Sequence, residues 1–127
     1  MVDKELLKGS TPMLVLSVLM DGPSYGYEIA KRIEERSAGV LEGKEGTLYP
    51  LLHQLEMKGW LDSHKEHVSG RMRKYYRVTQ KGKKVFAKLV GEWESFSNAV
   101  DRTISSAKAT RPGVSKGLQH SYSGEGV

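Results

Sequence analysis

Cysteine is absent from the 127-residue sequence. This absence excludes disulfide bonds, thiolate metal sites and cysteine nucleophiles. A chain without disulfides suits a reducing compartment, and we expect a cytoplasmic protein.

Long apolar runs are scarce as well. The longest, Met13–Met20, is ended by Asp21-Gly22-Pro23. It falls well short of the about 20 apolar residues that a membrane-spanning helix needs, and no small-residue cleavage site follows it. We therefore expect neither a membrane span nor a signal peptide.

The patterns of an enzyme or a metalloprotein are missing too. The sequence has no glycine-rich phosphate loop, and no nucleophile is accompanied by an evident base. His64 and His67 lie three residues apart on a predicted strand, so their side chains point to opposite faces and make a poor metal pair. We expect no catalysis, no cofactor and no metal site.

Acidic residues are scarce in one particular segment. Between His64 and Lys84, Glu66 is the one acidic residue against eight basic ones, so the net charge of this segment is +7. The whole chain has a formal net charge of +5, so the remaining residues sum to −2. The basic residues are Lys65, Arg71, Arg73, Lys74, Arg77, Lys81, Lys83 and Lys84. A local positive patch favours a polyanionic partner and salt-dependent binding. A solvated surface hairpin is the alternative interpretation of the same charges.

The first half of the sequence predicts two helices. Residues 6–20 have helical character, divided near Gly9 and Pro12 because proline fits best in the first turn of a helix. Ser24 is expected to cap a second, amphipathic helix that runs to about Ser37.

A third helix is predicted from Gly46 or Thr47 to Lys58, with Pro50 in its first turn and Gly59 as its C-terminal stop. Four of its leucines fall within one arc and are expected to face the core, namely Leu48, Leu51, Leu52 and Leu55. The opposite surface is then left for a ligand.

A hairpin and a long helix complete the predicted fold. The strands are expected at 60–68 and 74–78 around Ser69-Gly70, with one of Tyr75 and Tyr76 buried and the other on the surface. Thr79 is expected to cap the last helix, whose apolar residues have heptad spacing: Phe86, Leu89, Trp93, Phe96 and Val100. This stripe either packs on its own domain or, as we favour, forms a dimer interface.

The predicted fold is mainly α, with a small β component: a winged helix-turn-helix followed by a dimerisation helix. We expect a DNA-binding domain at residues 1–79, the dimerisation helix at 80–109 and a disordered tail at 110–127, where glycine and serine are frequent and apolar periodicity is absent.

Several residues are candidates for contacts with double-stranded DNA. Thr47 and Tyr49 lie at a helix N-terminus, where the free N–H groups and the helix dipole favour phosphate. Pro50, His53 and Gln54 lie further along the exposed face and are candidates for base edges, although such residues are often only solvated. The predicted wing adds cations near its turn: Arg71, Arg73 and Lys74.

Five sequence blocks, in order, resemble PadR-family transcriptional regulators. They are Leu6-Leu7-Lys8-Gly9, Gly22-Pro23-Ser24-Tyr25-Gly26-Tyr27-Glu28-Ile29, Gly46-Thr47-Leu48-Tyr49-Pro50-Leu51-Leu52, Leu55-Glu56-Met57-Lys58-Gly59 and Arg73-Lys74-Tyr75-Tyr76-Arg77-Val78-Thr79. The resemblance covers about residues 5–105. The single helix after the wing is similar to the subgroup that includes a lactococcal multidrug-binding regulator.

The resemblance implies a homodimeric repressor that binds an inverted repeat and is released by a small molecule. It also implies DNA-backbone contacts from Tyr25 and Lys31, and a planar aromatic effector held at Trp93. The matching effector positions are Leu6, Met13, Ser17 and Ser97, with Phe96 close enough in sequence to fill part of the space. The alternative function is a basic winged-helix module that binds protein or RNA, without ligand sensing.

Overall fold

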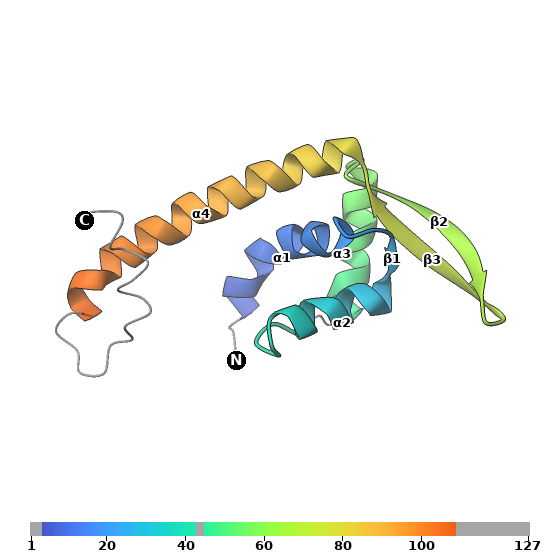
Figure 1. The fold of residues 1–127 in the computed structure, drawn as a ribbon, viewed down its shortest axis with the longest axis horizontal. Coiled ribbons are helices and arrows are strands. Elements are labelled where there is room, and N and C mark those ends of the chain that lie inside the picture. Colours follow the sequence, from blue (N-terminus) through green and yellow to red (C-terminus); the bar gives the residue numbers. More distant parts are fainter. Residues whose placement is uncertain (1–3, 43–44, 109–127) are drawn as a thin grey trace. The chain divides into compact units, whose positions relative to one another are not determined.

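A computed structural model describes residues 4–42 and 45–108 (Figure 1). The described chain forms two compact parts, which meet within the last helix between Leu89 and Val90. The elements, in chain order, are α1 (Lys4–Leu19), β1 (Ser24–Tyr25), α2 (Gly26–Arg36), α3 (Glu45–Met57), β2 (Leu61–Val68), β3 (Arg71–Val78) and α4 (Gln80–Lys108). This is the predicted winged-helix class, with a small sheet and a long C-terminal helix.

Helix α1 is one continuous helix, so the predicted division near Gly9 and Pro12 is wrong. Proline inside a helix costs roughly 3 kcal/mol, because it removes a hydrogen bond and crowds the preceding turn. The C-terminal half of α1 buries four apolar side chains, and each stabilises the fold by about 1.5–3 kcal/mol. These are Val15, Leu16, Val18 and Leu19. Packing therefore outweighs the local penalty.

A two-residue strand before α2 was not predicted. Strand β1 pairs with β3 in antiparallel register, Ser24 opposite Tyr76 and Tyr25 opposite Tyr75. The predicted N-cap at Ser24 is wrong, because the capping position belongs to Tyr25, which makes no side-chain capping hydrogen bond. Ser24 is fully buried in the sheet, and its hydroxyl has no hydrogen-bond partner among the described residues.

The core of the first part joins the three helices to the sheet. Helix α2 contacts both α1 and α3, and α3 contacts β2. The predicted inward face of α3 is confirmed, because Leu48, Leu52 and Leu55 are buried and Leu51 is half-buried against them. The amphipathic helix α2 buries Ile29 and Ile33 in the same core. The sheet contributes Leu61, Tyr76 and Val78 to the same cluster.

Helix α3 begins at Glu45, slightly earlier than predicted, so Pro50 lies beyond its first turn. Its end is as expected. Gly59 has a φ of +79°, its N–H bonds the carbonyl of Glu56 at 2.9 Å, and the N–H of Trp60 bonds the carbonyl of Leu55 at 3.0 Å. This pair of bonds is a Schellman motif, and it turns the chain directly into β2.

Strands β2 and β3 form the predicted hairpin, which projects from the helices in Figure 1. The sheet order is β1-β3-β2. Ser69 and Gly70 both have positive φ, as a two-residue hairpin turn requires. Strand β3 begins at Arg71, earlier than the predicted residue 74. Of the two adjacent tyrosines, Tyr76 is buried and Tyr75 is half-buried.

Thr79 caps α4 as predicted. Its Oγ1 accepts the N–H of Gly82 at 3.0 Å and donates to the carbonyl of Gly59 at 2.7 Å, so the cap also ties the helix to the end of α3. A side chain at Gly82 would overlap the carbonyl of Trp60. Early α4 residues, including Phe86 and Leu89, pack against the core of the first part.

The second part, as far as it is described, is the remainder of α4 from Val90. It exposes four large apolar side chains at helical spacing: Trp93, Phe96, Val100 and Ile104. The predicted tail at 110–127 lies outside the described residues. In the described part of the chain, no helix combines the length and the apolar character that crossing a membrane takes.

Candidate nucleic-acid interface

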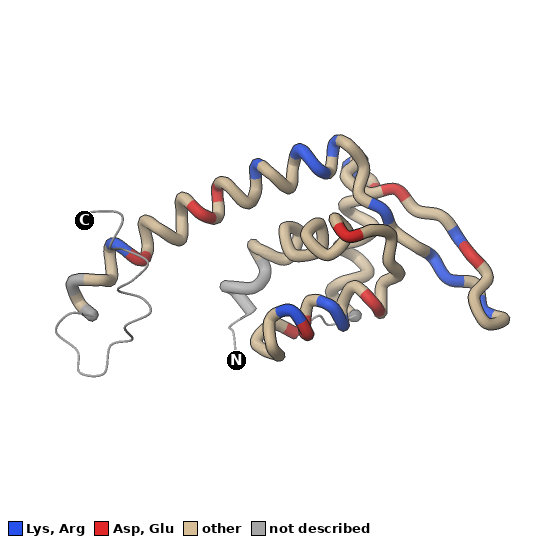
Figure 2. Tube along the Cα trace, viewed as in Figure 1, with Lys and Arg blue, Asp and Glu red and all other residues tan. Residues whose placement is uncertain are grey.

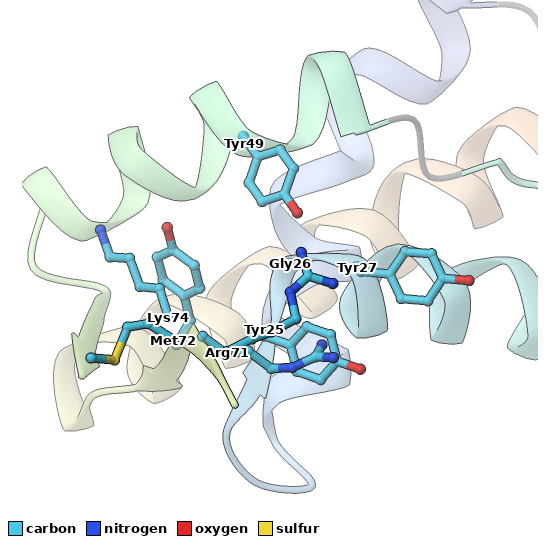
Figure 3. A pocket seen from close by; sticks show the side chains of 9 residues that line it. Tyr25, Gly26, Tyr27, Tyr49, Arg71, Met72 and Lys74 are labelled. Atoms are coloured by element: carbon cyan, nitrogen blue, oxygen red, sulfur yellow. The ribbon is translucent and has the colours of Figure 1, made fainter. Parts of the chain in front are cut away.

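An open groove of about 600 Å³ lies between the start of α2, helix α3 and the start of β3 (Figure 3). Tyrosines and cations make up most of its lining, which consists of Tyr25, Gly26, Tyr27, Tyr49, Arg71, Met72, Arg73, Lys74 and Tyr76. Five of the predicted DNA-contacting residues therefore meet at one place: Tyr25, Tyr49, Arg71, Arg73 and Lys74.

The absence of a side chain at Gly26 sets the distance between α2 and α3 at this groove. The ring of Tyr49 reaches from α3 toward Gly26 (Figure 3), and a methyl group at Gly26 would overlap that ring. The glycine at the first position of α2 therefore leaves room for the Tyr49 ring to lie against the helix. Tyr49 itself is 44% exposed, so it contributes surface to the groove while it contacts α2.

A ladder of rings supports Arg73. Its guanidinium lies 4.3 Å from the centre of the Tyr25 ring. Tyr25 in turn meets Tyr75 edge to face at 5.5 Å, and His64 stacks on Tyr75 at 5.6 Å. These rings come from all three strands, one each from β1, β3 and β2. A cation over an aromatic face is electrostatically favourable, so the ladder holds the guanidinium in place.

The Nε atom of Arg73 is shielded from solvent and has no hydrogen-bond partner among the described residues. A buried donor without a partner is unfavourable, and an anionic acceptor beside it would relieve this cost. Arg73 also lines the groove. The arrangement is suited to binding an anionic oxygen.

The N-terminus of α2 opens on the same groove. Since Tyr25 makes no side-chain capping bond, the first N–H groups of α2 lack the usual side-chain acceptor. Tyr27 lies beside them and is 54% exposed. Sequence reasoning missed Tyr27 as a site residue, although it stands in the Tyr25-Gly26-Tyr27 block. The signal available in the sequence was its place at the predicted start of the second helix.

Figure 2 shows basic positions along the hairpin. These cations differ in their side-chain partners. Arg77 bonds Asp62 across the strands at 2.7 Å, and Lys74 lies 3.2 Å from the Glu56 carboxylate of α3. The sequence suggested no acidic partner for Lys74, because Glu56 lies on a different element. Arg71 is exposed and forms no ion pair within the described residues.

The exposed face of α3 is as predicted. Thr47, Pro50, His53 and Gln54 are all exposed. Lys31 is exposed on α2 and does not line the groove. The structure thus gathers the start of β3, the start of α2 and Tyr49 of α3 at the groove. The predicted base-reading residues lie along the exposed face of α3.

The residues predicted for an effector fall in both parts of the chain. In the second part, Trp93 and Phe96 are exposed with their ring centres 6.1 Å apart, and Ser97 bonds the carbonyl of Glu94 at 3.3 Å. In the first part, Met13 and Ser17 are half-buried on α1, and only the backbone of Leu6 is described.

Groups of histidine, aspartate or glutamate close enough to hold a metal ion do not occur among residues 4–42 and 45–108. His64 has a carboxylate partner instead, because its ring nitrogen lies 2.6 Å from Glu66.

Comparison with known proteins gives the family. The model of the transcriptional regulator PadR-like family matches residues 15–88. An uncharacterised protein of Lysinibacillus sphaericus is 34% identical over 102 residues, which are 80% of this chain and 94% of that protein. A transcriptional regulator of Mycobacterium tuberculosis is 31% identical over 80 residues, 63% of this chain and 72% of that protein.

Solved structures agree with the sequence matches. A transcriptional regulator from Clostridium thermocellum has a TM-score of 0.75 and 31% identity, covering 80% of this chain and 97% of that one. A PadR-family regulator from Eggerthella lenta has a TM-score of 0.71 and 34% identity, covering 79% and 86%. The chain therefore belongs to the PadR-like family of transcriptional regulators.

Proposed function

We propose that the protein is a homodimeric repressor that binds a double-stranded operator and is released by a small planar aromatic effector. The observation that supports DNA binding best is the groove, where the start of α2, two wing arginines and four tyrosines meet. Phosphate is the ligand that fits such a set of donors, because arginine and free N–H groups both bind its oxygens.

In this proposal the DNA backbone lies in the groove. The α2 N-terminus, Tyr27 and Arg73 bind phosphates, and Arg71 contacts the backbone beside the wing turn. Helix α3 then enters the major groove and presents Pro50, His53 and Gln54 to base edges. Thr47, Tyr49 and Lys31 are proposed as further contacts to the backbone.

Dimerisation is proposed from the exposed stripe of α4. Trp93 is 48% exposed and Phe96 is 62% exposed, values that are unusual for large apolar residues spaced along one helix face. A second copy of the same stripe is a self-complementary partner, as in a two-fold interface. Two such subunits would read two half-sites, which is the usual way for a winged helix to gain affinity and specificity.

The effector is proposed from the same aromatic surface. Trp93 and Phe96 present two neighbouring rings, and flat apolar molecules bind indoles by stacking. Leu6, Met13, Ser17 and Ser97 stay predictions from the family resemblance. For release, the effector must bind more tightly to a dimer whose half-site spacing no longer fits the operator.

Binding assays with labelled duplexes test the central proposal. The binding sequence is selected from a randomised duplex pool, and its affinity is compared with that of a shuffled duplex, a single strand and an RNA hairpin. Replacing Arg71 and Arg73 by alanine is expected to make binding less dependent on salt. The slope of log affinity against log salt concentration should become shallower by about 0.9 per lost phosphate contact. Arg36→Ala is the control for each single replacement. It removes one positive charge at the far end of α2, where Arg36 pairs with Asp21.

Two results would contradict the proposal. Equal affinity for the selected and the shuffled duplex would leave only a non-specific polyanion binder. A preference for RNA, or a failure to bind either nucleic acid, would instead favour the protein- or RNA-binding module that the sequence also allows.

A further inference from the structure

Glu56 lies in α3, the helix proposed to enter the major groove, and its carboxylate contacts both strands of the wing. Its Oε2 accepts the hydroxyl of Ser63 in β2 at 2.6 Å, and its Oε1 lies 3.2 Å from Nζ of Lys74 in β3. Glu56 stands in the last turn of α3, on the flank between the buried leucines and the exposed face. One side chain thus connects the element that enters the DNA groove to the hairpin beside it.

The surroundings favour the charged form of both partners. The hydroxyl of Ser63 is the main cause that lowers the pKa of Glu56, burial opposes it, and Lys74 lowers the pKa further. For Lys74, burial works against the charge, but the bonds and charges of Glu56 and Tyr76 more than offset it and raise its pKa. Lys74 also lies 5.2 Å from the centre of the Tyr76 ring.

A second ion pair in the same hairpin provides a natural contrast. Asp62 of β2 and Arg77 of β3 bond each other through two contacts, at 2.7 and 3.1 Å. That pair joins the two strands of the wing, which are already held by the sheet. Unlike Glu56, it gives no connection to α3.

We propose that Glu56 is a positioning residue that holds α3 and the β2–β3 hairpin at one fixed angle, so that both contact the same duplex. This inference rests on the proposed DNA-binding function and adds to it a residue that needs no contact with DNA. A fixed angle matters because base contacts and phosphate contacts form together only when both elements keep their register.

The same pair gives the wing a second property. While Lys74 is bound to Glu56, its charge is partly neutralised and contributes less to non-specific binding of phosphate. Loss of Glu56 would therefore have opposite effects on two kinds of affinity. Specific binding falls because the helix and wing lose their alignment, and non-specific binding is kept or gains because Lys74 is released.

The first measurement follows the angle itself and requires no DNA. Because the chain lacks cysteine, cysteines introduced at Met57 and His67 can carry two spin labels. Met57 is highly exposed at the end of α3, and His67 lies about 20 Å along β2 from Leu61, at 3.3 Å per residue. Pulsed electron paramagnetic resonance, with labelled protein diluted in unlabelled protein, is expected to give a broader distance distribution for Glu56→Gln and an unchanged one for Asp62→Asn.

The second measurement compares the selected duplex with the shuffled one. Glu56→Gln is expected to lower the ratio of the two affinities about tenfold, the value of one lost base contact. Its affinity for the shuffled duplex should not fall. The slope of log affinity against log salt concentration should steepen by up to about 0.9, because Lys74 is released. A variant that merely unfolds would lose both affinities together. Ser63→Ala, which keeps both charges, provides a milder test and should lower the ratio less.

The outcomes separate the two proposals. An unchanged distance distribution, or a Glu56→Gln protein that discriminates as well as the wild type, overturns the positioning role alone. A wild-type protein that does not prefer the selected duplex overturns the proposed function, and this inference with it.

Discussion

The guanidinium of Arg73 lies 4.3 Å from the centre of the Tyr25 ring, in a contact between β3 and the residue that caps α2. It links the wing to the start of the helix-turn-helix. It also gives Tyr25 a role that the sequence did not indicate. The family resemblance implies that Tyr25 contacts the DNA backbone, and in the structure its ring lies against the guanidinium that we propose as a phosphate contact.

Tyr25→Leu is therefore expected to weaken duplex binding nearly as much as Arg73→Ala. The leucine removes the ring, and the guanidinium loses an interaction of about 0.5–2 kcal/mol that orders it. Affinities of the two single variants and the double variant, measured with the same duplex, give the coupling between the residues. The double variant should bind little worse than either single one.

Tyr25→Phe is the control for this prediction. It keeps the ring and removes only the hydroxyl, so its affinity should stay close to that of the wild type. A large loss with phenylalanine would mean that the hydroxyl itself contacts DNA, as the family resemblance implied.

Gly26→Ala is expected to damage the groove by displacing Tyr49. The added methyl group overlaps the Tyr49 ring, which must swing toward solvent. We expect duplex affinity to fall about tenfold, as for one lost contact. The free energy of unfolding should fall by about 1 kcal/mol, which is at the low end for an overpacked core because the ring has room to move. Chemical denaturation and duplex titration measure the two effects.

Two further variants test the cause. Gly9→Ala places the same methyl group in open space on α1, and we expect it to stabilise the protein by about 0.5–1 kcal/mol. Adding Tyr49→Ala to Gly26→Ala should restore stability without restoring DNA binding. If Gly26→Ala binds DNA normally, the close approach of Tyr49 is irrelevant to the site.

The sequence predicted those parts of the fold that depend on periodicity and on local turn chemistry. The inward leucines of α3, the Gly59 stop, the Ser69-Gly70 turn and the Thr79 cap all follow from residues close together in the chain. The errors lie where tertiary contacts decide. Core packing carries α1 through Pro12, and pairing with Tyr76 removes Ser24 from the capping position.

Five residues that line the groove were predicted from the sequence as DNA contacts, but the partners of their side chains were not predicted. The wing cations stand out by their charge. The platform under Arg73 and the carboxylate beside Lys74 come from residues 48 and 18 positions away in the chain, Tyr25 and Glu56. No local pattern reports such pairs, because only the fold brings β1, α3 and β3 together.

The lowered pKa of Glu56 predicts a pH dependence of stability. A carboxyl whose pKa is lower in the folded state stabilises that state above its ordinary value of 4.5, and this contribution is lost as the pH falls through the folded value. Glu56→Gln should remove it. The two proteins are expected to differ at pH 7 by less than about 1 kcal/mol, since the pair keeps solvent contact, and to converge in acid. Denaturation at a series of pH values would show a constant difference if Glu56 does not contribute.

Phe96→Asp is expected to give monomers with little operator binding. A charge placed in an apolar seam is strongly unfavourable unless it finds a partner. Asn98→Asp adds the same charge two residues further along α4, off the stripe, and should leave the dimer intact. Sedimentation velocity over a range of concentrations distinguishes the two variants. A wild-type protein that is already monomeric at micromolar concentration would remove the dimer from the proposal.

Trp93 is predicted to report the binding of a planar aromatic effector. Its indole lies 6.1 Å from the Phe96 ring, and an exposed pair of rings gains by covering its apolar surface with a flat molecule. Such a molecule should quench the Trp93 fluorescence. If it is an inducer, it should also lower operator affinity, by the factor by which it binds the free dimer more tightly than the operator-bound dimer. A panel of planar dyes and phenolic compounds is titrated against the free protein and against its operator complex.

Trp60 is the background in this measurement, because it is half-buried in the first part and fluoresces as well. Titrations are therefore made with Trp60→Phe, which keeps an aromatic ring at that position, and repeated after Trp93→Leu as the matched control. Binding at the stripe predicts quenching in the first protein and none in the second. Reciprocal coupling adds a stricter requirement, because a saturating operator must weaken the ligand by the same factor as the ligand weakens the operator. A ligand that quenches Trp93 and leaves operator affinity unchanged binds the stripe without acting as an inducer, and the regulator would then take its signal at a different site.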